Sequence, residues 1–397
     1  MIELLKIFLV LAVAVFLIYK NVRVEYTIFS SAVFLGLIFG LGLAEILQVS
    51  FRAFLDADTV ELALIVVLIT FLGVLMKHVE SLSNIVDSLN GLFGDARVAL
   101  MGIPAFIGLL PMPAGAMVSA PFVGELGDKV GISPEQKTVV NYWFRHIWEF
   151  SFPLYPAIIL AAAILEVPYS EICVNQFPLT IIAVVVGFLL ICTRIRGKGY
   201  LVVEKSFFEN GVVLIKDVWP VALVIILALL FKVNLLASLI VTITFFAASR
   251  KVKLVDALKM FNQVNATRLI ILVFSAMIFK SMVETSQAAV NLPQIFTELS
   301  IPIPVIIFSI PFIVGLLTGY SWAMVGISFP IILPFLSSLD AALLAYCGGL
   351  MGLFLSPVHL CLVLTREYFK ADVRRVYIML APLIILMSIA GFTLSIL

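Results

Sequence analysis

Long apolar runs separated by short polar links make up most of this chain. A helix needs about 20 mostly apolar residues to cross the roughly 30 Å hydrocarbon core of a bilayer. In the first half, runs near that length are Leu4–Tyr19, Tyr26–Gln48, Thr59–Met76, Thr138–Leu165 and Asn175–Thr193. In the second half they are Val212–Val233, Leu235–Ser249, Leu269–Met282, Asp340–Leu364 and Val376–Leu397. The pattern predicts an all-α, polytopic membrane protein with about five crossings in each half.

Two other apolar segments, residues 98–124 and 304–336, are interrupted by helix-breaking residues. The first contains Gly108-Leu-Leu-Pro-Met-Pro-Ala-Gly-Ala-Met-Val-Ser-Ala-Pro121, and the second contains Gly315-Leu-Leu-Thr-Gly-Tyr-Ser-Trp-Ala-Met-Val-Gly326. Both have Gly-Leu-Leu followed after a short variable stretch by Ala-Met-Val, 207 residues apart (315 − 108). Broken apolar segments at matching places in two halves are typical of transporters that are built from repeats and bind substrate at the breaks.

Two further landmarks support an internal repeat. Val79-Glu-Ser81 recurs as Val283-Glu-Thr285, and Phe150-Ser-Phe-Pro153 recurs as Phe354-Leu-Ser-Pro357, both 204 residues later. We therefore predict a first repeat at 1–193, a cytoplasmic linker at 194–217 and a second repeat at 218–397. In each repeat a re-entrant hairpin, at 98–124 or 304–336, precedes a broken helix.

The composition agrees with a membrane protein. Hydrophobic residues make up 63% of the chain and charged residues 12%, whereas a soluble domain is about half apolar and about a quarter charged. The formal net charge of +1 gives no indication of a nucleic-acid partner. The apolar composition makes the lipid bilayer the expected surroundings. No cofactor motif is evident, and the four cysteines, which show no paired spacing, are expected to be packed thiols.

The basic residues test the topology, because cytoplasmic loops are enriched in Lys and Arg. If each broken segment enters and leaves on one side, each half crosses an odd number of times and the second half is inverted. One side then receives Lys20, Arg23, Lys77, Arg97, Lys129, Lys137, Arg194, Arg196, Lys198, Lys205, Lys216, Arg250, Lys251, Lys253, Lys259, Arg366, Lys370, Arg374 and Arg375. The other receives Arg52 with Asp56, Asp58, Glu166, Glu171, Glu298 and Asp340. This bias favours inverted repeats in the cell membrane with both termini on the external side.

The two hairpin tips and the two helix breaks form the predicted substrate site. Irregular backbone at membrane depth is tolerated only where it is buried in protein or lines a watery cavity. Proline frees backbone carbonyls in a helix, and the first broken helix carries Pro153 and Pro156. The predicted substrate-binding residues of the first half are Pro111, Met112, Pro113, Ala114, Gly115, Ser119, Ser151 and Pro153. Those of the second half are Thr318, Gly319, Tyr320, Ser321, Ser356 and His359.

Ionisable residues inside apolar helices are functional candidates by default. Arg145 is the predicted partner of an anionic solute, and His146, Glu149 and His359 are the predicted ion-coupling residues. The alternatives are an internal ion pair between Arg145 and Glu149, one helical turn apart, and hydrogen-bonded packing roles for the histidines. The histidines are far apart in sequence and none has a second ligand at metal-binding spacing, so we predict no metal site.

Two motifs resemble a family of prokaryotic integral membrane proteins known as domain of unknown function 401. They are Leu110-Pro-Met-Pro-Ala-Gly-Ala-Met-Val-Ser-Ala-Pro121 and Leu355-Ser-Pro-Val-His-Leu-Cys-Leu-Val-Leu-Thr-Arg-Glu-Tyr-Phe369. That family looks related to the ion-transporter superfamily of gluconate, citrate, dicarboxylate and arsenite carriers. The resemblance implies two inverted repeats, each with a re-entrant hairpin and a broken helix, often assembled as homodimers. The sodium-coupled dicarboxylate members have Ser-Asn-Thr at each tip, whereas neither tip here has an asparagine.

We therefore predict a secondary active transporter, not an enzyme, that carries a small organic anion by an elevator or rocking motion. The departure at the tips favours H⁺ as the coupling ion, with Na⁺ as the alternative. An intramembrane serine hydrolase or protease, with Ser321 and His359 as its dyad, is a second hypothesis. It leaves the twin broken segments unexplained, because Ala114 stands where the first repeat would need a serine. A lipid-handling membrane protein is a third hypothesis.

Overall fold

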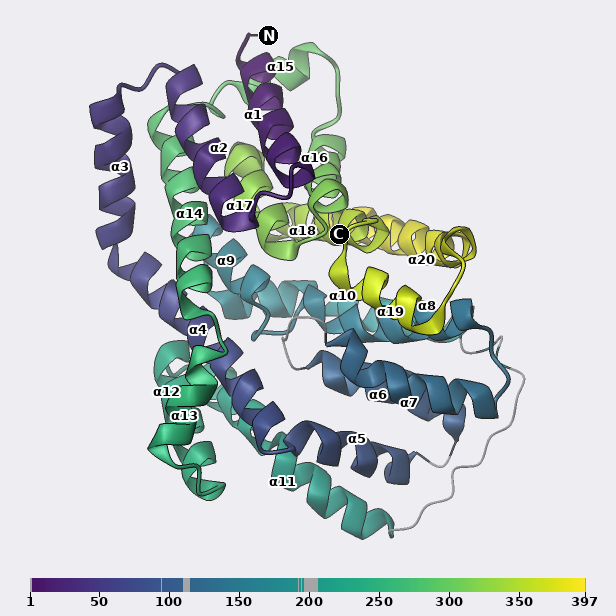
Figure 1. Cartoon of the computed structure of the whole chain (residues 1–397). Helices are drawn as coiled ribbons and strands as arrows, with labels where there is room; N and C mark the ends of the chain where they lie inside the picture. Colours follow the sequence, from purple (N-terminus) through teal and green to yellow (C-terminus); the bar gives the residue numbers. More distant parts are fainter. Residues whose placement is uncertain are drawn as a thin grey trace.

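The computed structural model describes residues 2–93, 95–109, 115–191, 193, 195 and 206–396, and its regular elements are helices (Figure 1). Seven helical stretches in this part of the chain are long and apolar enough to cross a membrane. They are α1 (Ile2–Tyr19), α4 (Ala57–His78), α10 (Tyr169–Leu190), Phe207–Leu230, α14 (Ala266–Thr285), Leu339–Phe369 and α20 (Val373–Leu394). The predicted all-α, polytopic architecture is confirmed.

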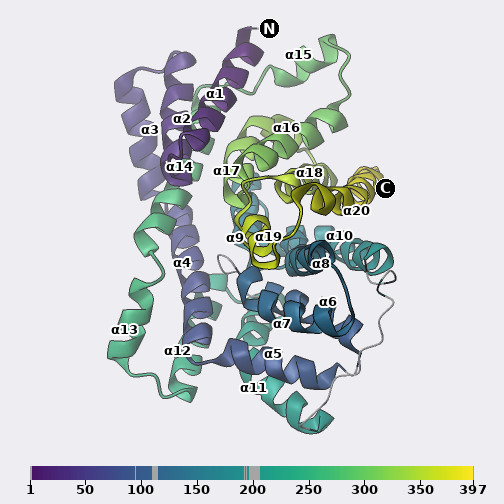
Figure 2. The ribbon, with the colours of Figure 1, turned by 45° about the vertical axis from the view of Figure 1, so that its right-hand side comes forward.

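Both interrupted segments fold as pairs of adjacent helices. The first pair is α6 (Ala96–Gly108) with α7 (Ala116–Lys129), and the second is α16 (Ile303–Thr318) with α17 (Ser321–Ile332) (Figure 2). Gly319 ends α16 with a φ of +62°, a left-handed conformation that suits a residue without a Cβ. The short helix α15 (Leu292–Glu298) meets α16 at 115°. Residues 110–114, which contain most of the first predicted tip, lie outside the described residues.

The helix that follows each hairpin is interrupted, as the proline positions predict. α8 (Pro134–His146) passes into a 3₁₀ turn at Ile147–Phe150, and α9 (Pro156–Leu165) follows. In the second half, residues 356–359 separate α18 (Leu339–Leu355) from α19 (Leu360–Phe369). α6 packs on α8 and α7 on α19, whereas α16 packs on α18 and α17 on α9. Each hairpin therefore contacts the broken helices of both halves.

The predicted single span Tyr26–Gln48 is wrong. The structure divides it into α2 (Val24–Ile38) and α3 (Leu43–Leu55). Gly40, with a φ of +94°, lies in the turn, and Gly42 is the N-cap residue of α3. The run stays apolar across this turn, so length and hydrophobicity did not reveal it.

Helices also occupy stretches that the sequence presents as polar links. α5 (Ser81–Leu92) and α13 (Leu254–Asn262) lie in two such links. α11 (Phe207–Ile225) begins inside the predicted linker, where Ser206 and Glu209 form a capping box. A π-helical turn, Ile226–Leu230, continues α11, and α12 (Leu235–Ser249) has the predicted bounds.

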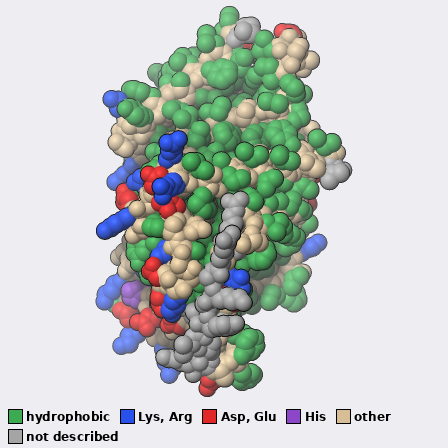
Figure 3. Space-filling view, turned by 90° about the vertical axis from the view of Figure 1, so that its right-hand side faces the viewer, with side chains coloured by type: hydrophobic (Ala, Val, Ile, Leu, Met, Phe, Trp, Pro, Cys, Tyr) green, Lys and Arg blue, Asp and Glu red, His purple; other side chains and the backbone are tan. Residues whose placement is uncertain are grey.

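The surface is largely apolar. In the face shown in Figure 3, hydrophobic side chains cover most of the area, and charged side chains gather toward the left edge and the lower end. Soluble proteins rarely expose contiguous apolar patches of this extent. The distribution agrees with a protein whose sides face lipid.

α16 and α18 approach closely because glycines lie at their contact. A Cβ added at Gly352 would overlap the carbonyl oxygen of Phe312, and one added at Gly315 would overlap the carbonyl oxygen of Gly349. Small residues at a helix contact let backbones come together in a membrane, where van der Waals packing drives helix association. This contact holds the second hairpin against the second broken helix.

Gly352→Ala should lower the thermal unfolding midpoint of the purified protein in detergent. The added methyl group meets backbone, which cannot rotate away, so the expected cost is about 1–3 kcal/mol. Gly73→Ala is the matched control, because nothing lies within 4 Å of a Cβ added at that position of α4. An equal loss of stability in both variants would contradict this account of the contact.

The Glu166 carboxylate, just after α9, is held by α14. Lys280, whose side chain is buried, donates from Nζ to Glu166 Oε1 at 2.8 Å. This hydrogen bond and the charge of Lys280 lower the pKa of Glu166 below its ordinary value. The ion pair joins the two halves of the chain.

Glu166→Gln should therefore reduce stability at neutral pH. The loss is expected to stay below about 1 kcal/mol, because the Glu166 side chain is 78% exposed and screened by solvent. A lowered folded-state pKa stabilises the fold above the ordinary carboxyl pKa, and that contribution is lost as pH falls through the folded value. The difference in unfolding midpoint between wild type and variant should thus shrink on acidification. A difference that grows on acidification would refute the assignment.

Candidate functional site

A cavity of about 230 Å³ lies where the second hairpin, both helix breaks and the start of α14 meet. Drug-sized ligands fill about 300–1,000 Å³, so this volume suits a small solute. Its lining comprises Thr70, Arg145, His146, Glu149, Tyr155, Pro156, Val264, Asn265, Arg268, Leu269, Gly319, Tyr320, Ser321, Trp322, His359, Leu360 and Cys361. The wall thus combines charged and polar side chains with apolar ones, as in sites that bind and orient a polar molecule.

Two histidines face each other across this cavity wall. His146 ends α8, His359 precedes α19, and their Nε2 atoms are 3.3 Å apart. His146 Nδ1 lies 2.6 Å from the carbonyl oxygen of Tyr142, and His359 Nδ1 lies 3.1 Å from that of Gly319. Because a carbonyl oxygen can only accept, each Nδ1 donates and a neutral ring presents a bare Nε2 lone pair to its neighbour. A cation between the two nitrogens would relieve the repulsion of these lone pairs.

Arg145 is held by the first hairpin through Tyr155. Arg145 Nη1 donates to the hydroxyl of Tyr155 at 2.8 Å, and that hydroxyl donates to the carbonyl oxygen of Gly108 at 2.7 Å. Both side chains are buried. Trp148 Nε1 adds a hydrogen bond to the carbonyl oxygen of Ala105 at 2.9 Å. The end of α6 is therefore fixed to the first helix break, although the tip itself lies outside the described residues.

Glu149 supplies the acidic group of the cavity. Its Oε1 lies 3.8 Å from His146 Nε2, and its buried Oε2 has no hydrogen-bond partner among the described residues. An unsatisfied carboxylate oxygen in a buried position is costly. A bound cation, a proton or a hydrogen-bond donor of a ligand would satisfy it.

The structure brings only some of the sequence-predicted residues to the cavity. Arg145, His146, Glu149, Gly319, Tyr320, Ser321 and His359 line it, and Gly115, Ser119, Ser151, Pro153, Thr318 and Ser356 do not. Pro111, Met112, Pro113 and Ala114 lie outside the described residues.

Three predicted hydroxyls have local hydrogen bonds instead. Ser119 Oγ donates to the carbonyl oxygen of Ala116 at 3.2 Å, and Ser151 Oγ lies 2.7 Å from the hydroxyl oxygen of Thr180. The backbone N–H of Tyr320 donates to Thr318 Oγ1 at 3.4 Å. These bonds shape the segments around the cavity, and they occupy the hydroxyls that were expected to contact substrate.

The sequence reasoning missed four polar side chains of the lining: Thr70, Asn265, Arg268 and Cys361. Asn265 and Arg268 lie outside the predicted span 269–282, so its bounds kept them out of the set of candidate residues. In the structure α14 begins at Ala266, so Arg268 lies in its first turn. Cys361 follows His359 by two residues, and this spacing is the clearest indication in the sequence that Cys361 lies near the candidate site.

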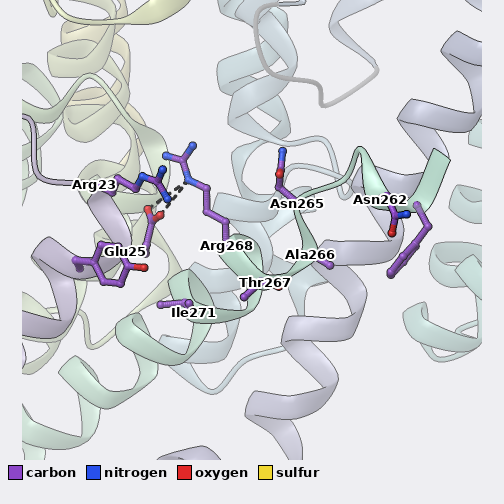
Figure 4. Close-up of a pocket in the computed structure, with 10 residues that line it drawn as sticks. Arg23, Glu25, Asn262, Asn265, Ala266, Thr267, Arg268 and Ile271 are labelled. Carbon is purple, nitrogen blue, oxygen red and sulfur yellow. Dashed lines mark hydrogen bonds and ion pairs between the residues drawn. The ribbon is translucent and has the colours of Figure 1, made fainter. Parts of the chain in front are cut away.

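A second pocket, of about 400 Å³, adjoins the cavity. Asn265 and Arg268 line both spaces, and Arg23 and Glu25 line the second pocket. Figure 4 shows the side chains of Arg23 and Arg268 converging on Glu25, whose carboxylate lies 3.2 Å from Arg268 Nε. Glu25 is buried, whereas both arginines are exposed. The second pocket thus lies beside the central cavity and shares part of its wall.

Comparison with known proteins identifies the family. Residues 2–397 match the family described as "Protein of unknown function (DUF401)". The chain belongs to this family. The resemblance inferred from the two sequence motifs is therefore confirmed over essentially the whole chain.

A solved transporter has a similar fold. The crystal structure of the Alcanivorax borkumensis YdaH transporter, described as having an unusual topology, matches with a TM-score of 0.58 and 16% sequence identity. The match covers 84% of this chain and 84% of the transporter chain. At this identity the likeness shows the fold alone. No curated protein matches the sequence.

Tyr155→Phe should destabilise the protein by about 1–3 kcal/mol, because it leaves the buried carbonyl of Gly108 without this donor. The measurement is the thermal unfolding midpoint in detergent. Tyr19→Phe is the control, since Tyr19 is 80% exposed at the end of α1. If Tyr155→Phe is as stable as this control, the hydroxyl does not fix α6 to the helix break.

Proposed function

We propose that this protein is a secondary active transporter of a small anionic solute. The observation that carries the proposal is the cavity enclosed by a hairpin tip and two helix breaks, with the buried Arg145 in its wall. Guanidinium groups bind carboxylates and similar anions through charge-assisted hydrogen bonds. Similarity to a solved transporter fold supports membrane transport as the general activity.

Inverted repeats are part of the proposal, and the packing of the helices supports them. α7 packs on α19 as α17 packs on α9, and α2 packs on α14 as α12 packs on α4. If α1–α10 are compared with α11–α20, then α7 corresponds to α17, α9 to α19, α2 to α12 and α4 to α14. Each contact therefore recurs with the two halves interchanged. A two-fold relation between halves provides the two equivalent arrangements that alternating access needs.

The proposal also places both termini on the external side, following the distribution of Lys and Arg, and two contacts join segments that this distribution assigns to one side. Asn175 Nδ2 donates to Asp340 Oδ1 at 3.0 Å, and Asn234 Nδ2 donates to Glu61 Oε1 at 2.6 Å. Each contact joins segments that the distribution of Lys and Arg assigns to the external side. In this proposal the second pocket, beside Arg23, lies on the opposite, cytoplasmic side.

The coupling ion in this proposal is H⁺, with Na⁺ as the alternative. Glu149, His146 and His359 remain its candidate carriers, and all three line the cavity. The unsatisfied oxygen of Glu149 supports a proton or cation at this point. A homodimer is the proposed assembly, following the resemblance to the wider superfamily.

No specific observation favours the serine hydrolase. Ser321 lines the cavity with His359, but both ring nitrogens of His359 lie against other groups, Gly319 and His146. A nucleophile needs a base within hydrogen-bonding reach of its hydroxyl. A lipid-handling role is likewise not favoured by the small cavity, whose wall carries charged side chains.

Arg145→Gln should weaken binding of the anionic solute at least about tenfold, because it removes the buried charged partner. The measurement is the ligand-induced rise in unfolding midpoint across a panel of mono-, di- and tricarboxylates, at two pH values with and without Na⁺. Uptake of each radiolabelled hit into proteoliposomes follows. Dependence of that uptake on pH or Na⁺ identifies the coupling ion.

Arg374→Gln is the control for this experiment, because Arg374 is exposed at the start of α20, and it should behave as wild type. The unliganded unfolding midpoint shows whether each variant folds. An anion that binds and crosses equally well in Arg145→Gln would contradict the role of Arg145. A panel without any midpoint shift in the wild type would contradict an anionic solute.

A further inference from the structure

We propose that His146, His359 and Cys361 form a binding site for a late first-row transition-metal ion such as Zn²⁺ or Co²⁺. One ligand atom from each of these side chains lies within 4.8 Å of the other two. Spacing along the chain suggested that no metal site exists, yet two histidines 213 positions apart come together in the fold. The inference rests on this geometry and not on the proposed transport function.

The orientation of the two histidine rings favours a metal site. Each Nδ1 donates to a backbone carbonyl oxygen, that of Tyr142 for His146 and that of Gly319 for His359. Metal-binding histidines almost always donate their other ring N–H in this way, which fixes the tautomer and aims the lone pair. Here the two Nε2 atoms, which carry the lone pairs of neutral rings, face each other.

The distance between the two Nε2 atoms also favours a metal site. Zn²⁺ binds imidazole nitrogen at about 2.0–2.1 Å, and in a tetrahedral site two such ligands are about 3.3 Å apart. The observed Nε2–Nε2 distance is 3.3 Å. The spacing of the two nitrogens therefore matches that of two imidazole ligands of one metal ion.

The chemistry of the third ligand selects the class of metal. Cys361 lies in the first turn of α19, two residues after His359, and is not in a disulfide. A thiolate with two imidazoles suits Zn²⁺, Co²⁺ and Cu⁺, whereas Mg²⁺ and Ca²⁺ require oxygen ligands. Three protein ligands leave a fourth position for water or for a solute that enters the cavity.

Charges of both signs surround the three proposed ligands. Glu149 Oε1 lies 3.8 Å from His146 Nε2 and adds negative charge beside the ligands. The nearest basic group in the same helix, Arg145, donates from Nη1 to the Tyr155 hydroxyl. Tyr142 packs its ring against both histidine rings, at centroid distances of 4.7 and 5.5 Å, and so holds their orientation.

A proton shared by the two rings is the competing occupant of this position. The two occupants differ in the role of Cys361. A shared proton is bound by the two imidazoles alone, whereas a metal ion is also bound by the Cys361 thiolate. A probe that reports on sulfur ligation therefore separates them.

The experiment is an anaerobic titration of Co²⁺ into the purified full-length protein in detergent, with its thiols reduced. The expected result is one Co²⁺ per chain, with the thiolate-to-cobalt charge-transfer band and strong d–d bands of a tetrahedral site, and displacement by Zn²⁺. Cys361→Ser should lose the charge-transfer band. His146→Gln and His359→Gln should each bind Co²⁺ at least about tenfold more weakly.

His78→Gln and Cys173→Ser are the matched controls, since neither residue lines the cavity, and both should keep the wild-type spectrum. The metal-free unfolding midpoint checks that each variant folds, and Cys361→Ala replaces Cys361→Ser if the serine variant does not. The proposal is overturned by a wild type without the charge-transfer band, by a band that persists in the Cys361 variant, or by its loss in a control. Anion binding without Co²⁺ binding overturns only the metal site, whereas Co²⁺ binding without anion binding overturns only the anionic solute.

Discussion

Backbone polar groups at membrane depth must find partners inside the protein, and the rest of this structure depends on how that requirement is met. Two helix breaks and a hairpin turn interrupt the regular hydrogen bonding near the middle of the chain's fold. Side chains replace the missing partners. Tyr155 and Trp148 donate to carbonyl oxygens at the end of α6, and His359 donates to that of Gly319.

Residues of the candidate site therefore both line the cavity and hold the interrupted segments in place. Tyr155 holds both Arg145 and the end of the first hairpin, and His359 holds the tip of the second hairpin while its other nitrogen faces His146. Such sharing explains why polar and aromatic side chains concentrate around a small cavity in a chain that is otherwise so apolar. It also ties any change in ligand binding to the positions of the hairpins.

The spans, the hairpins and the interrupted helices could be predicted from sequence, because apolar length and proline each act locally. The turn at Gly40 could not, since its flanks are as apolar as a helix that continues. The contact between His146 and His359 could not be predicted either, because it depends on how α8 and α19 pack in space. Arg268 was missed for a related reason: its position in the first turn of α14 depends on where that helix begins.

The contact between His146 and His359 has a consequence for how the molecule could move. The two side chains come from the breaks that follow α8 and α18, and their nitrogens stay in contact only in arrangements that keep both breaks together. If the breaks travel as one rigid body, this contact survives every state of a transport cycle. If the halves pivot against each other, it opens and closes once per cycle. For the proposed transporter, the distance between the two Nε2 atoms would thus distinguish an elevator from a rocking mechanism.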